Sequence, residues 1–197
     1  IKHMVKVGIN GFGRIGRLIL RALLENFKGK IQVVGINDLG SIEANAHLIK
    51  FDSTHGTLNY DVKTTKDGFH IGDQNIKVFA ERDPAKLPWG KIGVDVVLEC
   101  TGFFLDKKTA GKHIEAGAKK VIISAPAKEV DFTVVQGVNS KDLKKDHNII
   151  SNGSCTTNCL APVAMVLEND FGIEYGYMTT IHSYTVDQKL LDTLHND

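Results

Sequence analysis

The sequence of 197 residues is long enough for one or two domains, and its 42% hydrophobic and 24% charged residues are typical of a globular protein. The formal net charge of +1 gives no electrostatic basis for binding nucleic acid or an anionic membrane, and no apolar run approaches the roughly 18 residues of a membrane-spanning helix. Three cysteines, an odd number, argue against a disulfide framework and favour a reducing compartment. No signal peptide is visible, and residues 1–3, which precede Met4, are interpreted as a remnant of cloning.

Apolar runs alternate with helical patterns along most of the chain. We expect helices at residues 14–26, 44–51 and 107–115, and a hairpin excursion within residues 57–78. Strands are expected at residues 5–9, 31–36, 94–99, 121–124, 132–135 and 147–150. Nearly continuous apolar strands joined by helices are typical of a parallel sheet with both faces covered. The pattern therefore predicts an α/β fold with a doubly wound, mostly parallel sheet of the Rossmann type.

A glycine-rich turn joins the first strand to the first helix. Gly11, Gly13 and Gly16 form a G-x-G-x-x-G motif at this junction. The first glycine permits a tight turn, the second lets a pyrophosphate approach the backbone, and the third lets the helix pack on the strand. Asp38 follows the second strand, where a carboxylate can accept hydrogen bonds from a ribose and repel a 2′-phosphate. This combination predicts a dinucleotide site that prefers NAD over NADP; a plain glycine turn followed by a helix-capping aspartate is the alternative.

Cys155 stands near the first turn of a further predicted helix. Its preceding segment is an apolar run and a short turn, and a helical pattern follows. The helix dipole favours an anion there, but it supplies only about 0.3–1 kcal/mol. Since one pKa unit is about 1.36 kcal/mol, the dipole alone does not make a thiolate at neutral pH. A nucleophilic Cys155 therefore needs a cationic or basic partner; the alternative is a small buried cysteine.

His182 is the candidate partner for that thiolate. It lies 27 residues after Cys155, within residues 178–185, which are expected to form a strand that ends in polar residues. A helix and a returning strand fit into that separation. The chain thus carries a candidate nucleophile, a candidate base and a candidate nicotinamide site. A histidine at a strand end with a purely structural role is the alternative.

Together these segments resemble the phosphorylating glyceraldehyde-3-phosphate dehydrogenases. The resemblance covers nearly the whole chain from Met4 onward, and it is carried by residues 9–17, 51–53, 117–126, 154–159 and 182–185. It implies that Cys155 attacks the aldehyde and His182 takes up a proton as a hydride leaves for NAD. A thioester then forms, and inorganic phosphate releases it as an acyl phosphate. The implied reaction converts glyceraldehyde 3-phosphate to 1,3-bisphosphoglycerate in glycolysis.

The same resemblance assigns roles to further residues. It implies that Ser154 and Thr156 contact the attacking phosphate, and that Thr185 and Asp187 lie on the side of the substrate phosphate and nicotinamide. Cofactor contacts are implied for Gly11, Gly13, Arg14, Ile15, Gly16, Asp38, Arg82, Thr101, Gly102, Phe104 and Ser124. Within this set, Arg14 and Ile15 hold the pyrophosphate, and Asp38 holds the ribose.

The resemblance also implies an organisation for the protein. Residues 4–153 are expected to form the NAD-binding domain, and residues 154–197 the beginning of an α+β catalytic domain that is cut short at Asp197. A cytoplasmic homotetramer is implied, with no nucleic-acid or membrane partner. Two alternatives stay open: an erythrose-4-phosphate dehydrogenase, or an NAD-binding fragment without turnover whose incomplete sheet exposes apolar surface.

The two other cysteines are expected to be structural. Cys159 is four residues after Cys155 on the same predicted helix, and Cys100 ends a predicted buried strand. A structural zinc site needs four ligands, and the sequence has no second cysteine pair. We therefore expect no metal, and we interpret Cys159 as a packing residue.

Overall fold

The computed structural model describes residues 4–185; residues 1–3 and 186–197, including Asp187, lie outside the described part. A nine-stranded sheet runs through the molecule in the order β10-β11-β9-β8-β1-β2-β7-β6-β5. Neighbouring strands from β10 to β7 are parallel, and the hairpin β5-β6 joins β7 antiparallel. The nine strands are β1 (Val5–Asn10), β2 (Ile31–Asn37), β5 (Val62–Thr65), β6 (Gly68–Ile71), β7 (Gln74–Phe79), β8 (Val96–Glu99), β9 (Lys120–Ile123), β10 (Phe132–Thr133) and β11 (Ile149–Ser151).

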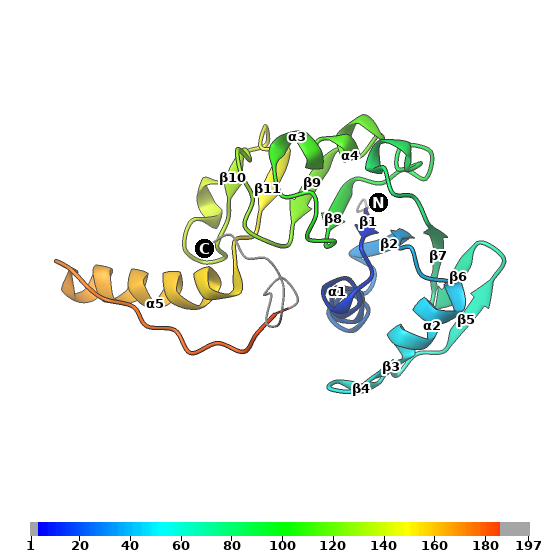
Figure 1. Cartoon of the computed structure of the whole chain (residues 1–197), viewed down its shortest axis with the longest axis horizontal. Helices are drawn as coiled ribbons and strands as arrows, with labels where there is room; N and C mark the ends of the chain where they lie inside the picture. The colour runs from blue at the N-terminus through cyan, green and yellow to red at the C-terminus, as the bar shows by residue number, and fades with distance from the viewer. Residues whose placement is uncertain (1–3, 186–197) are drawn as a thin grey trace, which may run out of the picture.

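Helices cover both faces of this sheet, as Figure 1 shows. On one side lie α1 (Arg14–Asn26) and α2 (Ile42–Lys50), and on the other lie α3 (Lys107–Ala110) and α4 (Lys112–Glu115). Short elements complete the fold: the β3-β4 pair (Phe51–Asp52 with Gly56–Thr57) and the 3₁₀ turns η1 (Pro84–Lys86) and η2 (Ser140–Asp142). The predicted doubly wound, mostly parallel sheet is confirmed.

Three buried clusters hold the layers together. Under α1 and α2, fully buried side chains such as Ile9, Leu20 and Ile36 form the largest cluster. Trp89 belongs to a second cluster, and Ala110 clusters with residues of β9 and β11 in a third. Because full burial of each large apolar side chain stabilises the fold by about 1.5–3 kcal/mol, these clusters hold the helices and loops against the sheet.

The predicted helix over residues 107–115 is divided in two. Asp106 caps α3 by accepting a hydrogen bond from Thr109 N, and α4 begins after Gly111. A Cβ on Gly111 would lie 2.8 Å from the carbonyl oxygen of Lys107, so only glycine fits at this close approach. The sequence pattern placed the helical region correctly but did not show this break.

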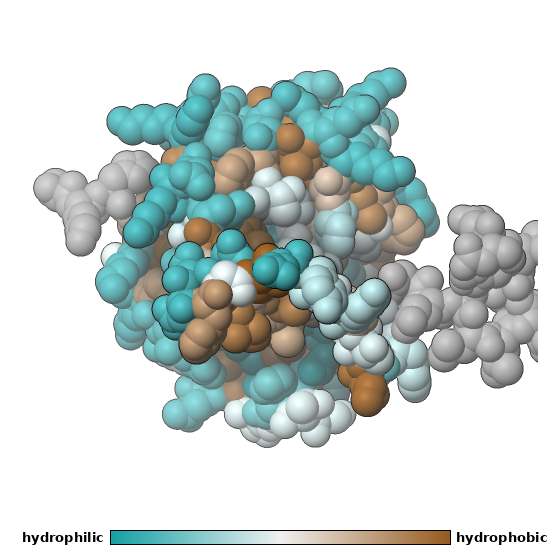
Figure 2. Space-filling model, turned by 90° about the vertical axis from the view of Figure 1, so that its left-hand side faces the viewer, coloured by the Kyte–Doolittle hydropathy of each residue, from teal (hydrophilic) through white to brown (hydrophobic). Residues whose placement is uncertain are grey.

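The last described helix, α5 (Cys155–Phe171), projects from the sheet domain. None of its residues is buried, and the chain then returns along it toward its N-terminal end. The prediction of a strand at residues 178–185 is wrong, because these residues pair with no strand among the described residues. A strand without a neighbour leaves its backbone N–H and C=O groups unpaired, so it is not stable alone. Figure 2, which faces this end, shows apolar groups at the surface; the exposed apolar residues here include Leu160, Val163, Val166, Leu167 and Phe171.

Replacing Gly16 by alanine is expected to destabilise the sheet domain. The added Cβ would lie 2.2 Å from the carbonyl oxygen of Gly11, a backbone atom that cannot turn away. Overpacking costs about 1–3 kcal/mol and exceeds the gain of about 1 kcal/mol that alanine brings to a helix interior. Thermal unfolding of Gly16→Ala and of the matched control Gly13→Ala, whose Cβ meets nothing within 4 Å, tests this. Equal melting temperatures for the two variants would contradict it.

Candidate functional site

The candidate cofactor site lies at the point in the sheet where successive strands stop adding on one side of β1 and begin adding on the other. From β1 the strand order runs to β2 and β7 on one side, and to β8 and β9 on the other. Ligands of open α/β sheets bind outside the carboxyl ends of the strands at such a reversal. A pocket of about 520 Å³ lies there, lined by Asn10, Gly11, Gly13, Asn37, Asp38, Leu39, Glu81, Arg82, Cys100, Thr101, Phe103 and Phe104.

The glycine turn fits a ligand that approaches the backbone closely. Gly11 has a φ of +90°, and a Cβ there would lie 2.8 Å from Thr101 N, so the turn rests on the neighbouring loop. Above Gly13 the space is open, since a Cβ would meet nothing within 4 Å. Gly13 also begins α1 without a side-chain cap, whereas α2 and α5 begin with a serine that caps the helix. The uncapped N–H groups and the open space form a cradle for a phosphate group.

Asp38 is held in place by the same turn. Its Oδ2 accepts a hydrogen bond from Phe12 N at 2.9 Å, and its Oδ1 accepts one from Gly40 N at 2.8 Å. Each oxygen keeps a further lone pair for a hydroxyl donor. The carboxylate therefore lines the pocket in a fixed orientation, beside the glycine turn.

The remaining predicted cofactor residues lie around this pocket or beside it. Arg82, Thr101 and Phe104 line it, and Gly102 lies within the same loop as Thr101. Ser124 follows β9, and its N–H donates to the carbonyl of Glu99 at 3.0 Å.

Arg14 and Ile15 begin α1 beside the glycine turn. Ile15 is exposed, and the guanidinium of Arg14 forms an ion pair with Asp52. Hydrogen bonds from the backbone N–H groups of His55 and Thr54, together with Arg14, lower the pKa of Asp52 to about 2. Asp52 thus stays ionised and holds Arg14 near the first turn of α1.

Cys155 and His182 meet in space despite their separation in sequence. Cys155 is the first residue of α5, and its Sγ lies 3.2 Å from Nε2 of His182. The other ring nitrogen of His182, Nδ1, lies 2.5 Å from the carbonyl oxygen of Ser183. A carbonyl can only accept, so Nδ1 carries a proton and Nε2 is free to accept one from the thiol.

This contact shifts the titration of both groups. The hydrogen bond with His182, aided by the backbone N–H of Thr156, lowers the pKa of Cys155. The carbonyl of Ser183 and the contact with Cys155 raise the pKa of His182. Both shifts favour the form in which a thiolate faces an imidazolium, which is the reactive form of such a pair.

Polar groups surround the start of α5. Ser154 caps the helix, since its Oγ accepts from Thr157 N at 2.9 Å, and Thr156 follows Cys155. Thr185 is the last described residue, three positions after His182. The structure thus brings Ser154, Thr156 and His182 to the N-terminal end of one helix.

The other two cysteines differ in their surroundings. Burial raises the pKa of the Cys100 thiol to about 12, so this cysteine is unreactive, as a structural role requires. Cys159 is exposed, so the prediction that it packs in a core is wrong for the described residues, which place nothing over that face of α5. Within residues 4–185, no group of three His, Cys, Asp or Glu side chains is placed to hold a metal ion, and no helix is long and apolar enough to cross a membrane.

Sequence reasoning missed several polar residues in and beneath the pocket. Asn10, Asn37 and Glu99 are each the last residue of a buried strand, and each is itself buried. A polar residue that ends an otherwise apolar run at the ligand-binding edge is the signal that could have found them.

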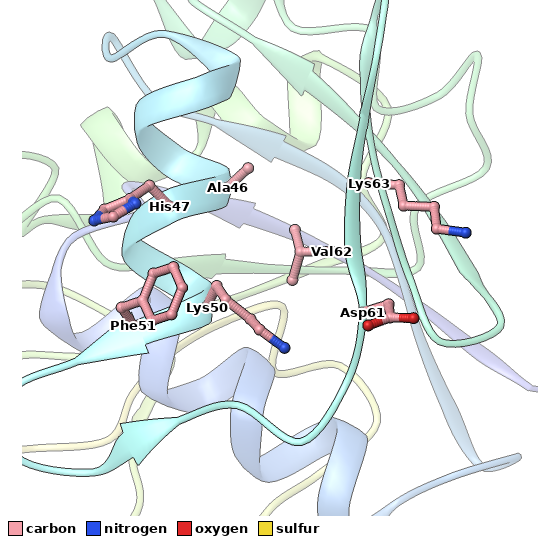
Figure 3. Close-up of a pocket in the computed structure, with 7 residues that line it drawn as sticks. All are labelled: Ala46, His47, Lys50, Phe51, Asp61, Val62 and Lys63. Carbon is pink, nitrogen blue, oxygen red and sulfur yellow. The ribbon is translucent and has the colours of Figure 1, made fainter.

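A second pocket, of about 460 Å³, lies between α2 and β5 and contains none of the predicted site residues. Figure 3 shows Ala46 and Lys50 of α2 on the side that faces Val62, with His47 on the opposite side of the helix and Lys63 pointing away from α2. The ammonium group of Lys50 donates to the carbonyl oxygens of Leu58 and Tyr60, so it is already engaged by the backbone. This pocket is a packing feature between α2 and the hairpin.

Comparison with known proteins matches two family profiles. The profile described as the NAD binding domain of glyceraldehyde 3-phosphate dehydrogenase matches residues 5–107, and that of its C-terminal domain matches residues 154–197. The chain belongs to the glyceraldehyde-3-phosphate dehydrogenase family. Glyceraldehyde-3-phosphate dehydrogenases of Xanthobacter flavus and Zymomonas mobilis are 56% and 58% identical over 98% of this chain, and each match covers 58% of the relative. The corresponding enzyme of Geobacillus stearothermophilus is 57% identical over 98% of this chain and 57% of its own length. The chain therefore spans somewhat more than half the length of these relatives.

Family membership makes NAD the cofactor of the sheet domain. The residues present fit this cofactor, because the open, uncapped glycine turn can take the pyrophosphate and Asp38 can take a ribose hydroxyl.

Replacing Asp38 by alanine is expected to relax the preference for NAD over NADP by about tenfold or more, which corresponds to about 1.4 kcal/mol. The carboxylate lines the pocket, and its charge opposes a 2′-phosphate. Dissociation constants for both dinucleotides measure the effect. Asp38→Asn separates its causes, because the amide removes the charge and keeps one acceptor. NADP binding as tight as NAD binding by the unmodified protein would contradict this prediction.

Proposed function

We propose that this protein oxidises glyceraldehyde 3-phosphate with NAD and inorganic phosphate, and that it releases 1,3-bisphosphoglycerate in glycolysis. The observation that carries the proposal is the 3.2 Å contact between Cys155 Sγ and His182 Nε2 at the start of a helix. That helix follows β11, whose carboxyl end lies at the same sheet edge as the dinucleotide pocket. The names of the family relatives support the same substrate.

The cofactor is proposed to extend along this edge. Asp38 follows β2 and Cys155 follows β11, and these strands are four spacings apart in the sheet, roughly 19 Å. A ribose bound at Asp38 and a pyrophosphate at Gly13 place the adenosine half over β1 and β2. Thr101 and Ser124, after β8 and β9, then lie toward the nicotinamide half. Arg82, Gly102 and Phe104 belong to the loops that bound this path.

Cys155 is proposed as the nucleophile and His182 as the base. The thiolate forms a bond to the aldehyde carbon as the carbonyl electron pair moves to oxygen, and the imidazolium of His182 donates its Nε2 proton to that oxygen, giving a thiohemiacetal. His182 Nε2 takes the hydroxyl proton as the carbonyl re-forms. NAD supplies the acceptor for the hydride that leaves this carbon. The product on the enzyme is a thioester of Cys155, which conserves the energy of the oxidation.

Inorganic phosphate is proposed to resolve the thioester. A phosphate oxygen attacks the acyl carbon, the carbon–sulfur bond breaks, and Cys155 leaves as a thiolate. Ser154 and Thr156 flank Cys155 and offer hydroxyl groups to the attacking phosphate. Thr185 and Asp187 are proposed to act at the substrate phosphate and nicotinamide side. The N–H groups at the start of α5 favour the negative charge that develops.

The organisation of the protein is part of this proposal. We assign residues 4–153 to NAD binding and residues 154–197 to the beginning of the catalytic domain. A cytoplasmic homotetramer is the proposed assembly, and the exposed apolar groups along α5 supply surface that further protein would cover.

Steady-state reduction of NAD by the intact protein tests the function. Glyceraldehyde 3-phosphate should be oxidised in a reaction that depends on phosphate, with a higher kcat/KM than erythrose 4-phosphate. A preference for erythrose 4-phosphate would favour the second dehydrogenase activity. NAD binding without oxidation of either aldehyde would reject both activities and favour an NAD-binding role.

A further inference from the structure

A chain of buried hydrogen bonds lies beneath the cofactor pocket, and no step of the proposed reaction uses it. Its centre is Glu99, the last residue of β8, whose side chain is only 1% exposed. Its partner His113, in α4, is 0% exposed. Burying a carboxylate with an imidazole destabilises the fold unless both groups form their hydrogen bonds, so the partners of this pair decide its effect.

Each carboxylate oxygen of Glu99 accepts two hydrogen bonds. Oε2 accepts from Asn10 Nδ2 at 2.5 Å and lies 2.9 Å from His113 Nε2. Oε1 accepts from Thr101 N at 2.8 Å and from the hydroxyl of Thr101. The carboxylate thus joins the end of β1, the loop after β8 and α4. Four donors therefore face this one carboxylate, and each of its hydrogen bonds is one that it accepts.

Trp89 fixes the orientation of the histidine. Its indole Nε1, which can only donate, lies 3.0 Å from His113 Nδ1. Nδ1 is therefore the acceptor, and Nε2 carries the proton that is donated to Glu99. Donors therefore converge on Glu99 from two sides: His113 from the Trp89 cluster in the core, and Asn10 and Thr101 from the side of the pocket.

On its other side the same network continues to residues that line the pocket. Asn10 Oδ1 accepts from Asn37 Nδ2 at 2.7 Å, and Asn37 exchanges two 2.8 Å hydrogen bonds with the backbone of Glu81. Asn37 precedes Asp38, and Glu81 precedes Arg82. The loop of Thr101 supports the glycine turn, because a Cβ on Gly11 would lie 2.8 Å from Thr101 N.

We propose that Glu99 is a positioning residue for the dinucleotide. It fixes the loop of Thr101, and through Asn10 it fixes the ends of β1 and β2, so that the glycine turn and Asp38 stand in the geometry that NAD needs. This inference rests on the proposed cofactor role of the pocket. Buried networks of this kind are rigid when every member is satisfied and lose that rigidity when one member is changed.

The test compares two carboxylate-to-amide variants of the intact protein. Glu99→Gln keeps the size of the side chain but turns one acceptor into a donor that faces other donors. Asp131→Asn is the matched control, since Asp131 also accepts two backbone N–H groups, from Asn148 and Ile149, and does not line the pocket. For Glu99→Gln we expect the Kd and the KM for NAD to rise at least tenfold, with kcat changed less than threefold. Asp131→Asn should lower the melting temperature and leave the Kd within twofold.

Hydrogen exchange and a second pair of variants separate positioning from simple instability. The amide of Thr101 should exchange at least tenfold faster in Glu99→Gln, and not in Asp131→Asn. His113→Leu should weaken NAD binding at least threefold, although His113 does not line the pocket, and His113→Gln, which can still donate and accept, should restore it. If Glu99→Gln does not fold, the comparison of NAD binding by His113→Leu and His113→Gln tests the inference in its place.

An unchanged Kd in folded Glu99→Gln, or equal Kd values for His113→Leu and the unmodified protein, would overturn the inference and leave the cofactor site standing. Failure of the unmodified protein to bind NAD would overturn the cofactor site and the inference together.

Discussion

Replacing Cys155 by serine should reduce phosphate-dependent oxidation of glyceraldehyde 3-phosphate by about four orders of magnitude or more, a loss typical for removal of a catalytic nucleophile. A hydroxyl group at this position does not ionise near neutral pH, and His182 alone cannot make it a comparable nucleophile. The start of α5 and the contact with His182 stay in place, so NAD binding should be unchanged. Steady-state kcat and the Kd for NAD measure the two effects.

Cys159→Ser is the matched control, because Cys159 is exposed on the same helix one turn further on. It should keep activity within about threefold of the unmodified protein, since exposed substitutions are usually nearly neutral. Iodoacetamide should modify Cys155 before Cys159 or Cys100. Full activity of Cys155→Ser, or faster alkylation of Cys159, would place the nucleophile elsewhere.

Replacing His182 by asparagine should lower kcat by about 10²–10⁴-fold, which is the usual contribution of a general base. The same change should alter how alkylation of Cys155 depends on pH. The thiolate forms as pH rises through the Cys155 pKa, and the contact with His182 lowers that pKa. In His182→Asn the midpoint of the rate profile should therefore move to higher pH, toward the ordinary range of a cysteine.

His70→Asn controls for the loss of a histidine, because His70 is an exposed residue of β6 far along the sheet order from β11. Its kcat and its alkylation profile should match those of the unmodified protein. The base assignment would be contradicted if His182→Asn kept the original midpoint and a kcat within threefold.

The sheet domain could be predicted well because its signals are local. The helix expected at residues 14–26 is observed over the same residues, since the glycine turn starts it and an apolar stripe covers one face. Strand positions follow from apolar runs, and β2 was predicted to within one residue. The glycine turn and Asp38 could be identified because their spacing is set by the strand–turn–helix geometry itself.

The parts that could not be predicted depend on contacts between distant residues. The network of Glu99, His113 and Asn10 joins positions that are up to 103 residues apart, and no local pattern records such a meeting. Residues 178–185 have the composition of a strand, but a strand needs a neighbour for its backbone groups, and the described residues supply none. The same absence of a covering layer leaves Cys159 exposed.

The central claim is that oxidation stores the acyl group on Cys155 until phosphate removes it. Mass spectrometry of the intact protein after mixing with glyceraldehyde 3-phosphate and NAD, in phosphate-free buffer, tests this directly. One acyl group should appear, it should map to the peptide that contains Cys155, and it should disappear when phosphate is added. An acyl group on another residue, or one NADH formed per enzyme with no covalent adduct before phosphate is added, would contradict the account.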